Sequence, residues 1–151
     1  ITIYCCANDQ IYYVAGLIKP EQPDCLKKTT WGSKGIRQVL INHVTEDGTA
    51  PVQDVMKARK ALEDKRAKLE SEGKKMEDST YNSELAKIKA GIIDGKKIQT
   101  MTVIIKATDN STYKNLVDAL DEMQICSIGK YVIDKMNPQD EALLKKNNVK
   151  E

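Results

Sequence analysis

Apolar residues follow two different periods along the chain, and the clearest change of period lies within residues 101–134. An aliphatic run at 102–107 gives way to an amphipathic pattern over 112–123, and a second apolar run follows at 128–133. Short apolar runs are typical of strands, whereas apolar positions three and four residues apart are typical of a helix. The pattern therefore predicts a strand-helix-strand unit of the size of one βαβ motif, around which the rest of the chain is arranged.

The helix expected over 112–123 has an apolar side and a polar side. Asp118, Asp121 and Glu122 fall on the polar side, where carboxylates are normally solvated. We expect the apolar side to cover one face of the sheet and to supply residues of the structural core, namely Tyr113, Leu116, Val117 and Leu120.

The N-terminal part of the chain carries the pattern of a hairpin followed by a helix. Strand-favouring residues at 1–5 and 11–15 flank a turn cluster, which predicts a β-hairpin. Residues 17–32 contain two prolines and several polar side chains and predict an irregular loop. Helical spacing over 33–45 predicts a helix whose buried side consists of Ile36, Val39, Leu40 and Val44.

Residues 46–100 have a different character. Pro51 can occupy the first turn of a helix. Two thin apolar stripes follow, and one apolar residue per heptad is too little for a coiled-coil seam, so they predict a helical hairpin whose stripes meet or lie on the core. The stripes are Val55, Leu62, Leu69 and Met76, then Tyr81, Leu85, Ile88 and Ile92.

The same segment is rich in charge. Residues 57–97 hold 12 basic and 8 acidic side chains, a local net charge of 12 − 8 = +4. We expect these charges to form a solvated surface. A basic arm that binds anionic lipid or another envelope component is the functional alternative.

Together the elements predict an α+β fold with a small mixed sheet in the order β-β-α-β-α-β and helices on one face. The domain consists of residues 1–45 and 101–151, and residues 46–100 form an inserted charged helical segment. Asn137 and Pro138 predict the start of a short C-terminal helix, because Asn caps helices and Pro favours the first helical position.

Composition is that of one domain with a modest aliphatic core. The chain has 151 residues, of which 40% are hydrophobic and 30% charged, and it contains no phenylalanine. A net charge of +2 gives no reason to expect nucleic acid as a partner. No apolar run approaches the roughly 18 residues of a membrane span. Because the chain opens without Met on a strand-like segment, we expect an upstream segment that can hold an anchor.

Residues that carry enzyme chemistry are sparse. Motifs for phosphate binding, for a nucleophile elbow and for a zinc-binding helix are absent. The single histidine, His43, has no neighbouring cysteine or carboxylate in sequence to orient it as a base. Asp118 and Asp121 have a spacing that can hold a cation, but we expect them only to be solvated. We therefore expect no enzyme, no metal and no cofactor.

The four cysteines form no metal-binding or redox motif. We expect them to be small buried or half-buried apolar residues. In an oxidising compartment Cys5 or Cys6 can pair with Cys25, and the sequence leaves open which of the two does so.

Two stretches of the second half carry an ordered set of residues, namely Val103 to Ala107, Asp109, Tyr113, Leu116, Val117, Asp121 and Ile128 to Val132. This set resembles the periplasmic domain of the ExbD/TolR family. That family has an aliphatic strand ending in a basic residue, Ala and Asp, a Tyr early in the next helix, a Val-x-x-x-Asp-like helix body and a final Ile-Gly-type strand. The resemblance covers residues 1–45 and 101–136, roughly half of the chain.

The chain departs from the family pattern in three places. Thr108 stands where the family usually has Asp, and Asp109 follows one residue late. The turn at 124–127 is short and lacks the usual Ala-Gly. The insertion at 46–100 is absent from short family members. These departures affect the contacts with partners more than the expected fold.

The resemblance implies a subunit of the inner membrane with one N-terminal transmembrane helix and this domain in the periplasm as a homodimer. In the ExbD branch such a subunit works with ExbB-like and TonB-like proteins in proton-motive-force-driven uptake through outer-membrane receptors. In the TolR branch it belongs to the Tol-Pal system of envelope integrity. A neighbouring gene for a TonB-like protein or for a Pal-like lipoprotein would distinguish the two.

The final strand is the expected docking surface. A sheet covered by helices on one face leaves edge strands with unpaired backbone groups, which can receive an extended peptide. We expect a segment of a TonB-like protein to dock on the partner-binding residues Ile128, Lys130, Tyr131, Val132 and Ile133. The alternative, a non-enzymatic small-molecule-binding α/β module, requires a concave apolar pocket with convergent polar groups.

Overall fold

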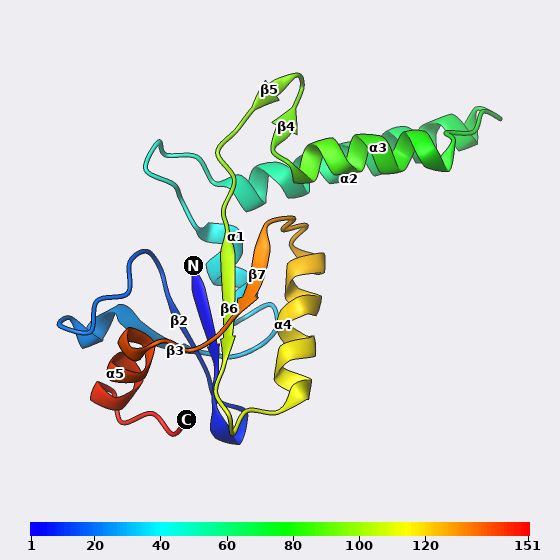
Figure 1. The fold of residues 1–151 in the computed structure, drawn as a ribbon. Helices are drawn as coiled ribbons and strands as arrows, with labels where there is room; N and C mark the ends of the chain where they lie inside the picture. The colour runs from blue at the N-terminus through cyan, green and yellow to red at the C-terminus, as the bar shows by residue number, and fades with distance from the viewer.

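A five-stranded mixed sheet forms the centre of the molecule (Figure 1). In the computed structural model, which describes all 151 residues, its strand order is β3-β2-β1-β6-β7. β1, β2 and β3 are antiparallel neighbours, whereas β6 runs parallel to β1 and β7 runs parallel to β6. The strands are β1 (Thr2–Cys5), β2 (Ile11–Val14), β3 (Leu26–Thr29), β6 (Val103–Ala107) and β7 (Tyr131–Asp134).

Helices cover both faces of this sheet. On one face α1 (Ile36–Asn42) and α4 (Tyr113–Ile125) enclose the larger core, which includes Ile3, Val103 and Ile105 from the strands. On the other face α5 (Pro138–Lys146) encloses a smaller core with Leu143 and Leu144. Short 3₁₀ turns at Ala7–Asp9 and Pro23–Cys25 connect strands.

The sequence-based prediction of an α+β fold with a mixed sheet is confirmed. Two details differ. The C-terminal helix α5 lies on the second face, because Tyr4, Cys6 and Val14 make that face apolar as well. The expected loop at 17–32 contains β3, an edge strand with only one buried residue, so its composition carries almost no strand signal.

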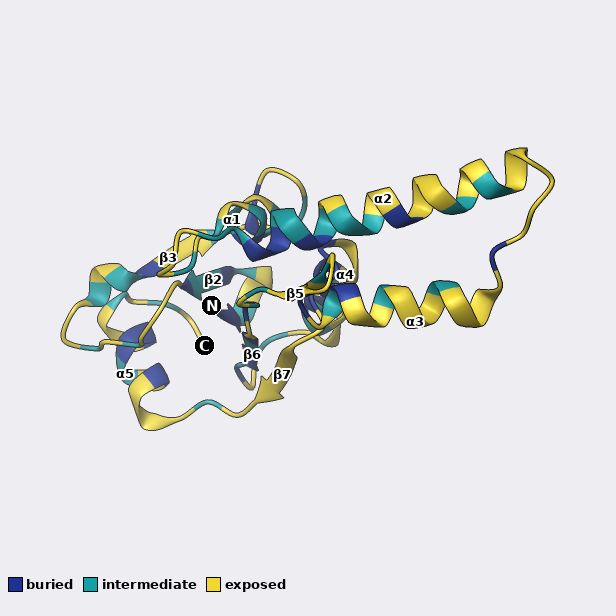
Figure 2. Ribbon diagram, turned by 90° about the horizontal axis from the view of Figure 1, so that it is seen from above, coloured by how far each residue is buried: buried dark blue, intermediate teal, exposed yellow.

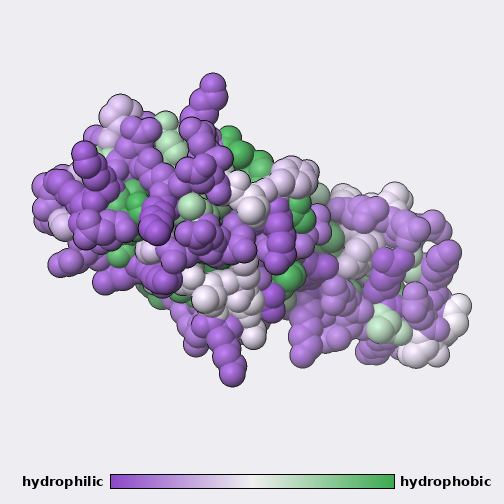
Figure 3. All heavy atoms as spheres, turned by 90° about the horizontal axis from the view of Figure 1, so that it is seen from below, coloured by the Kyte–Doolittle hydropathy of each residue, from purple (hydrophilic) through white to green (hydrophobic).

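The insertion forms an arm that projects from one end of the body (Figures 1 and 2). It consists of α2 (Pro51–Ser71), α3 (Asp78–Lys89) and a small hairpin of β4 (Ile92–Ile93) and β5 (Lys96–Lys97). Mostly hydrophilic side chains cover the arm (Figure 3). Its helices meet along a small cluster of buried apolar residues, Val55, Leu62, Met76 and Ile88.

The predicted helical hairpin is present, but it ends earlier than the apolar stripe suggested. Ile92 lies in β4, not in a helix. The reason is the pair Asp94 and Gly95, whose positive φ angles of 51° and 75° build a tight two-residue hairpin turn. None of the helices is long and apolar enough to cross a membrane.

Two of the four core residues predicted on α4 are exposed. Tyr113 is 79% exposed and Val117 is 36% exposed, whereas Leu116 and Leu120 are half-buried against the larger core. The buried side of the helix is rotated toward α1. It consists of Asn115, Ala119, Glu122 and Met123.

Polar partners explain this rotation. Glu122 accepts hydrogen bonds from Arg37, with Nε to Oε2 at 2.9 Å, and from the backbone N–H of Gly32 at 3.1 Å. Asn115 donates to Asp9 at 3.1 Å and accepts from the Trp31 indole at 3.4 Å. Polar side chains can be buried when they have such hydrogen-bond partners, although sequence spacing alone assigns them to solvent.

Candidate functional site

The candidate site is the open edge of the sheet at β7. This strand pairs only with β6 on one side. Tyr131 lies opposite Val103, whose N–H donates to the Lys130 carbonyl at 3.0 Å, and Ile133 lies opposite Ile105. In a parallel ladder with this register, the backbone N–H and C=O groups of Tyr131 and Ile133 face away from β6. They are free to bind another strand.

All four residues of β7 are exposed (Figure 2). Tyr131, Val132 and Ile133 are 40%, 51% and 54% exposed. Side chains alternate along a strand, so Tyr131 and Ile133 project on the face that carries α4, and Val132 projects on the face that carries α5. An added strand would therefore find apolar contacts on both faces.

Most of the exposed large hydrophobic side chains belong to two elements, α4 and β7. Nine large hydrophobic side chains are exposed, and six of them lie on α4 or β7. Tyr113 and Val117 lie on the flank of α4 that also carries Leu116 and Leu120, which pack against the larger core. The three on β7 are consecutive residues of one strand, and contiguous exposed apolar groups on a small domain usually mark a contact surface.

The opposite edge of the sheet is different. β3 exposes Lys27 and Lys28 at its centre, and only Leu26 is buried. Charged residues, lysine above all, protect an edge strand against pairing with other chains. The comparison of the two edges singles out β7 as the one that is open for docking.

The structure places the five predicted partner-binding residues differently. Tyr131, Val132 and Ile133 lie together on the edge, and Lys130 is exposed just before it. Ile128 is only 8% exposed and belongs to the larger core with Val52 of α2. Its assignment to the docking surface was wrong, because the chain at this residue still passes beneath the base of the arm.

A buried polar network holds α5 against the sheet. Lys106 Nζ donates to Asp140 Oδ2 at 2.5 Å, and the Tyr4 hydroxyl donates to Asp140 Oδ1 at 2.6 Å. Asp140 is completely buried and also closes a capping box with Asn137 at the start of α5. Burial and the hydrogen bond to Asp140 raise the pKa of the Tyr4 hydroxyl, so it stays protonated.

Sequence reasoning found only part of this network. The segment from Asn137 to Asp140 signals the start of a helix, and that prediction is confirmed. No local pattern indicates that Lys106, inside a strand, meets a carboxylate 34 residues later. An apolar strand interrupted by a single lysine is the one signal present, since buried lysines require a partner.

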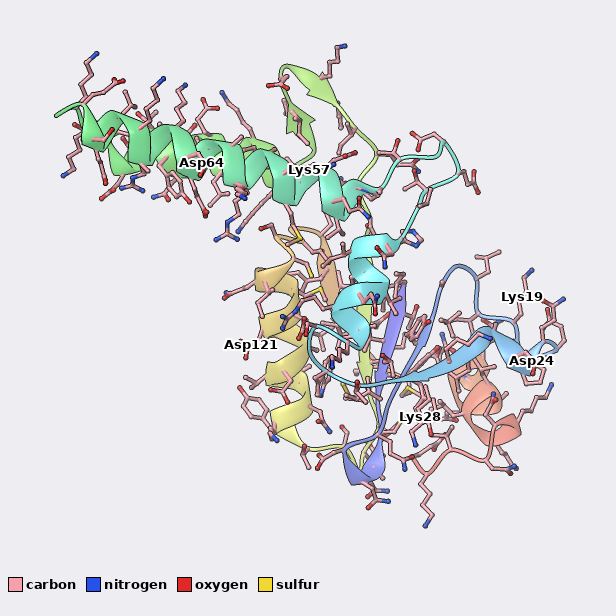
Figure 4. The ribbon with its side chains drawn as sticks, turned by 180° about the vertical axis from the view of Figure 1, so that it is seen from behind. Lys19, Asp24, Lys28, Lys57, Asp64 and Asp121 are labelled. Carbon is pink, nitrogen blue, oxygen red and sulfur yellow. The ribbon has the colours of Figure 1, made fainter.

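The residues considered for chemistry do not come together. No group of three or more His, Cys, Asp or Glu side chains is arranged to hold a metal ion. Asp121 points outward from α4 (Figure 4), and the side chain of Asp118 forms no hydrogen bond or ion pair. Burial, followed by the nearby terminal amine, lowers the pKa of His43.

The four cysteines are free thiols. Cys5, Cys6 and Cys126 are buried, and burial is the main cause that raises their pKa values to about 12, 12 and 11. Such thiols are poor nucleophiles. Cys25 is half-buried, and its thiol lies 3.7 Å from the Lys19 carbonyl.

A small-molecule site would require a deep apolar pocket. The apolar recess between the base of the arm and the segment before β7 has a volume of about 280 Å³, open space included. It is lined by Val52, Val55, Met101 and Ile128 together with Lys89 and Lys130. Four wider hollows, of about 850–1,280 Å³ with open space included, are lined in part by polar or charged side chains. Ligand pockets usually have about 300–1,000 Å³.

Comparison with protein-family models, with curated proteins and with solved structures finds no match to this chain.

Proposed function

We propose that this chain is the partner-docking domain of an ExbD-like subunit, and that β7 binds an extended segment of a TonB-like protein. The observation that carries the proposal is the open edge of β7. The N–H and C=O groups of two of its residues, Tyr131 and Ile133, face outward, and apolar side chains lie on both faces of the strand. The ordered resemblance of the segments to the ExbD/TolR family supports the same reading. The role is binding, without a chemical reaction.

In this proposal the domain lies in the periplasm and is anchored in the inner membrane by a helix upstream of Ile1. Together with an ExbB-like protein and as a homodimer it supports uptake driven by the proton-motive force. An added strand pairs with Tyr131 and Ile133, and its own side chains rest on Val132 and on the exposed flank of α4. Backbone pairing supplies affinity, and these apolar contacts select the sequence that binds.

The sheet behind this edge is held rigidly by two ion pairs, which supports a role in force transmission. The Arg37–Glu122 pair fixes α4 to α1, and the Lys106–Asp140 pair fixes α5 to the strand next to β7. The outer side of β7 itself is not paired with another strand. A rigid sheet with one open strand can pass on a displacement through backbone hydrogen bonds.

The test is titration of the ¹⁵N-labelled domain with a peptide from the periplasmic part of a TonB-like protein. We expect shifts at β7 and at the exposed flank of α4. Ile133→Pro removes the outward N–H of residue 133. The hydrogen bonds to β6 remain, because the β7 N–H groups that face β6 belong to Val132 and Asp134. We expect this variant to weaken binding by about tenfold or more.

The matched control is Ile133→Ala, which removes the same side chain but keeps the N–H group. If strand addition operates, this variant binds clearly better than Ile133→Pro while both keep the native spectrum elsewhere. Equal binding by both variants would show a side-chain contact in place of strand addition. Shifts that avoid Tyr131, Val132 and Ile133 altogether would refute docking at this edge.

A further inference from the structure

The arm lies at the end of the sheet where the chain begins. The Ile1 carbonyl accepts from Ile104 N at 2.9 Å, and the Ile1 amine donates to the Thr102 carbonyl at 3.3 Å, so Ile1 is held beside the start of β6. Val52, at the base of α2, packs into the core with Met101 at the same end. α2 and α3 run across the direction of the strands (Figure 1).

Charge is distributed unevenly between the arm and the body. Residues 57–97 carry 12 basic and 8 acidic side chains, a net charge of +4. The rest of the chain carries 12 basic and 14 acidic side chains, a net charge of −2. An anionic surface would therefore attract the arm and repel the body.

The side of the arm that faces away from the body combines lysines with apolar groups. The hairpin β4–β5 stands on this side (Figures 1 and 4). Lys97 pairs with Ile92 across the hairpin, so both project on one face, and both are exposed. The groove between the hairpin and the helices is lined by Ile88, Ile93, Lys65 and Lys87, together with the acidic Glu84 and Asp94.

The hairpin is held firmly in place. Ile98 N donates to the Gly91 carbonyl at 2.8 Å, and a Cβ atom at Gly91 would lie 2.6 Å from Thr100 and 2.9 Å from Ile98. Ile93 and Ile98 pack against the apolar cluster of the arm. The positions of Lys96 and Lys97 are therefore set by the fold, as a binding surface requires.

We propose that the outer side of the arm, with Lys96 and Lys97 at the tip of the hairpin, rests on the anionic phospholipid headgroups of a bilayer. The proposal rests on the proposed function, which places a membrane anchor upstream of Ile1 and hence a bilayer at this end of the sheet. The arm would then lie along the membrane plane. Ile92 enters the interface, and the lysines contact phosphates while their stems lie on apolar surface.

Cosedimentation of the 151-residue chain with vesicles tests the proposal. We expect binding to vesicles of phosphatidylethanolamine with phosphatidylglycerol, loss of binding at high salt, and none to phosphatidylcholine vesicles. The variant Lys96→Gln/Lys97→Gln should bind roughly 30-fold more weakly, which corresponds to about 1 kcal/mol per lysine. Circular dichroism checks that it is folded.

The matched control is Lys34→Gln/Lys114→Gln, which removes the same charge from two exposed positions of the body. We expect it to bind vesicles like the original chain. An equal loss in both pairs would show that net charge alone drives binding, and absence of binding to anionic vesicles would leave the arm a solvated spacer or a site for an acidic protein. Either result overturns the proposal.

The two proposals can fail separately. Lys96→Gln/Lys97→Gln leaves β7 intact and should keep peptide binding, whereas Ile133→Pro should keep vesicle binding. Loss of vesicle binding with intact peptide titration would refute only the contact of the arm with lipid. Absence of peptide binding with normal cosedimentation would refute only docking at β7.

Discussion

A single buried residue, Asp140, fixes the helix α5 to the sheet. Asp140 receives hydrogen bonds from Lys106, from Tyr4 and from the backbone of Asn137, and it is completely buried. Removing one charge of such a pair leaves the other without compensation, which usually costs more than the pair itself contributes.

We expect Asp140→Asn to lower the free energy of unfolding by about 3–5 kcal/mol, because Lys106 then stays buried without a counter-charge. Urea denaturation followed by circular dichroism measures the change. The double variant Lys106→Met/Asp140→Asn should regain a large part of the loss. If the double variant is as unstable as the two single changes added together, the two side chains do not act as a pair.

Reactivity of the thiols is a second prediction for single residues. With pKa values raised to about 11 or 12 by burial, Cys5, Cys6 and Cys126 hold almost no thiolate at pH 8, and little reagent can reach them. We expect an aromatic disulfide reagent to modify one thiol quickly in the folded chain, that of Cys25, and all four after denaturation. Cys25→Ser should abolish the fast phase.

At the same scale, α4 shows the limit of prediction from spacing. Leu116 and Leu120 were correctly placed toward the core, because apolar residues at helical spacing identify a buried side. The prediction that Tyr113 and Val117 belong to the core was wrong, because both are exposed. Glu122 is buried because it pairs with Arg37, which lies 85 residues away in sequence. Only the tertiary partner reveals such a residue.

Among the elements, those with a strong internal period were predicted and those defined by their neighbours were not. The helical hairpin, the helix 112–123 and the strands flanking it follow from spacing and appear in the structure. β3 exists because it pairs with β2, and the register of β7 against β6 depends on the whole sheet. The open edge was therefore expected with Tyr131, Val132 and Ile133 on it, whereas the burial of Ile128 in the core was not.

The arm should be the least stable element. Its helices share a cluster of only four buried apolar residues, so local opening costs less than opening of the sheet. We expect Leu62→Ala to speed amide exchange in α2 and α3 about tenfold or more and to leave β1 and β6 unchanged. Leu69→Ala, at a half-buried position of the same helix, should have a smaller effect. Equal acceleration in β1 and β6 would show that arm and body unfold together.

For the whole molecule, β7 also offers a route to self-association, which competes with peptide docking because one strand edge pairs with only one further strand. Two copies can pair their β7 strands about a twofold axis, since each edge presents the same donors and acceptors to the other. Analytical ultracentrifugation should show a monomer–dimer equilibrium that Ile133→Pro shifts to monomer, whereas Lys96→Gln/Lys97→Gln has no effect. An unchanged equilibrium in Ile133→Pro would place the dimer contact elsewhere.

The lysines of β3 give this pairing a natural end. A sheet with two open edges could add copies without limit and grow into a fibre, whereas a sheet that is open on one side stops at two. Lys27 and Lys28 close the second side. We expect Lys27→Val/Lys28→Val to turn a finite pair into polymers that scatter light and bind thioflavin. Two charged side chains on a short edge strand would thus keep a domain that can pair through β7 from forming polymers.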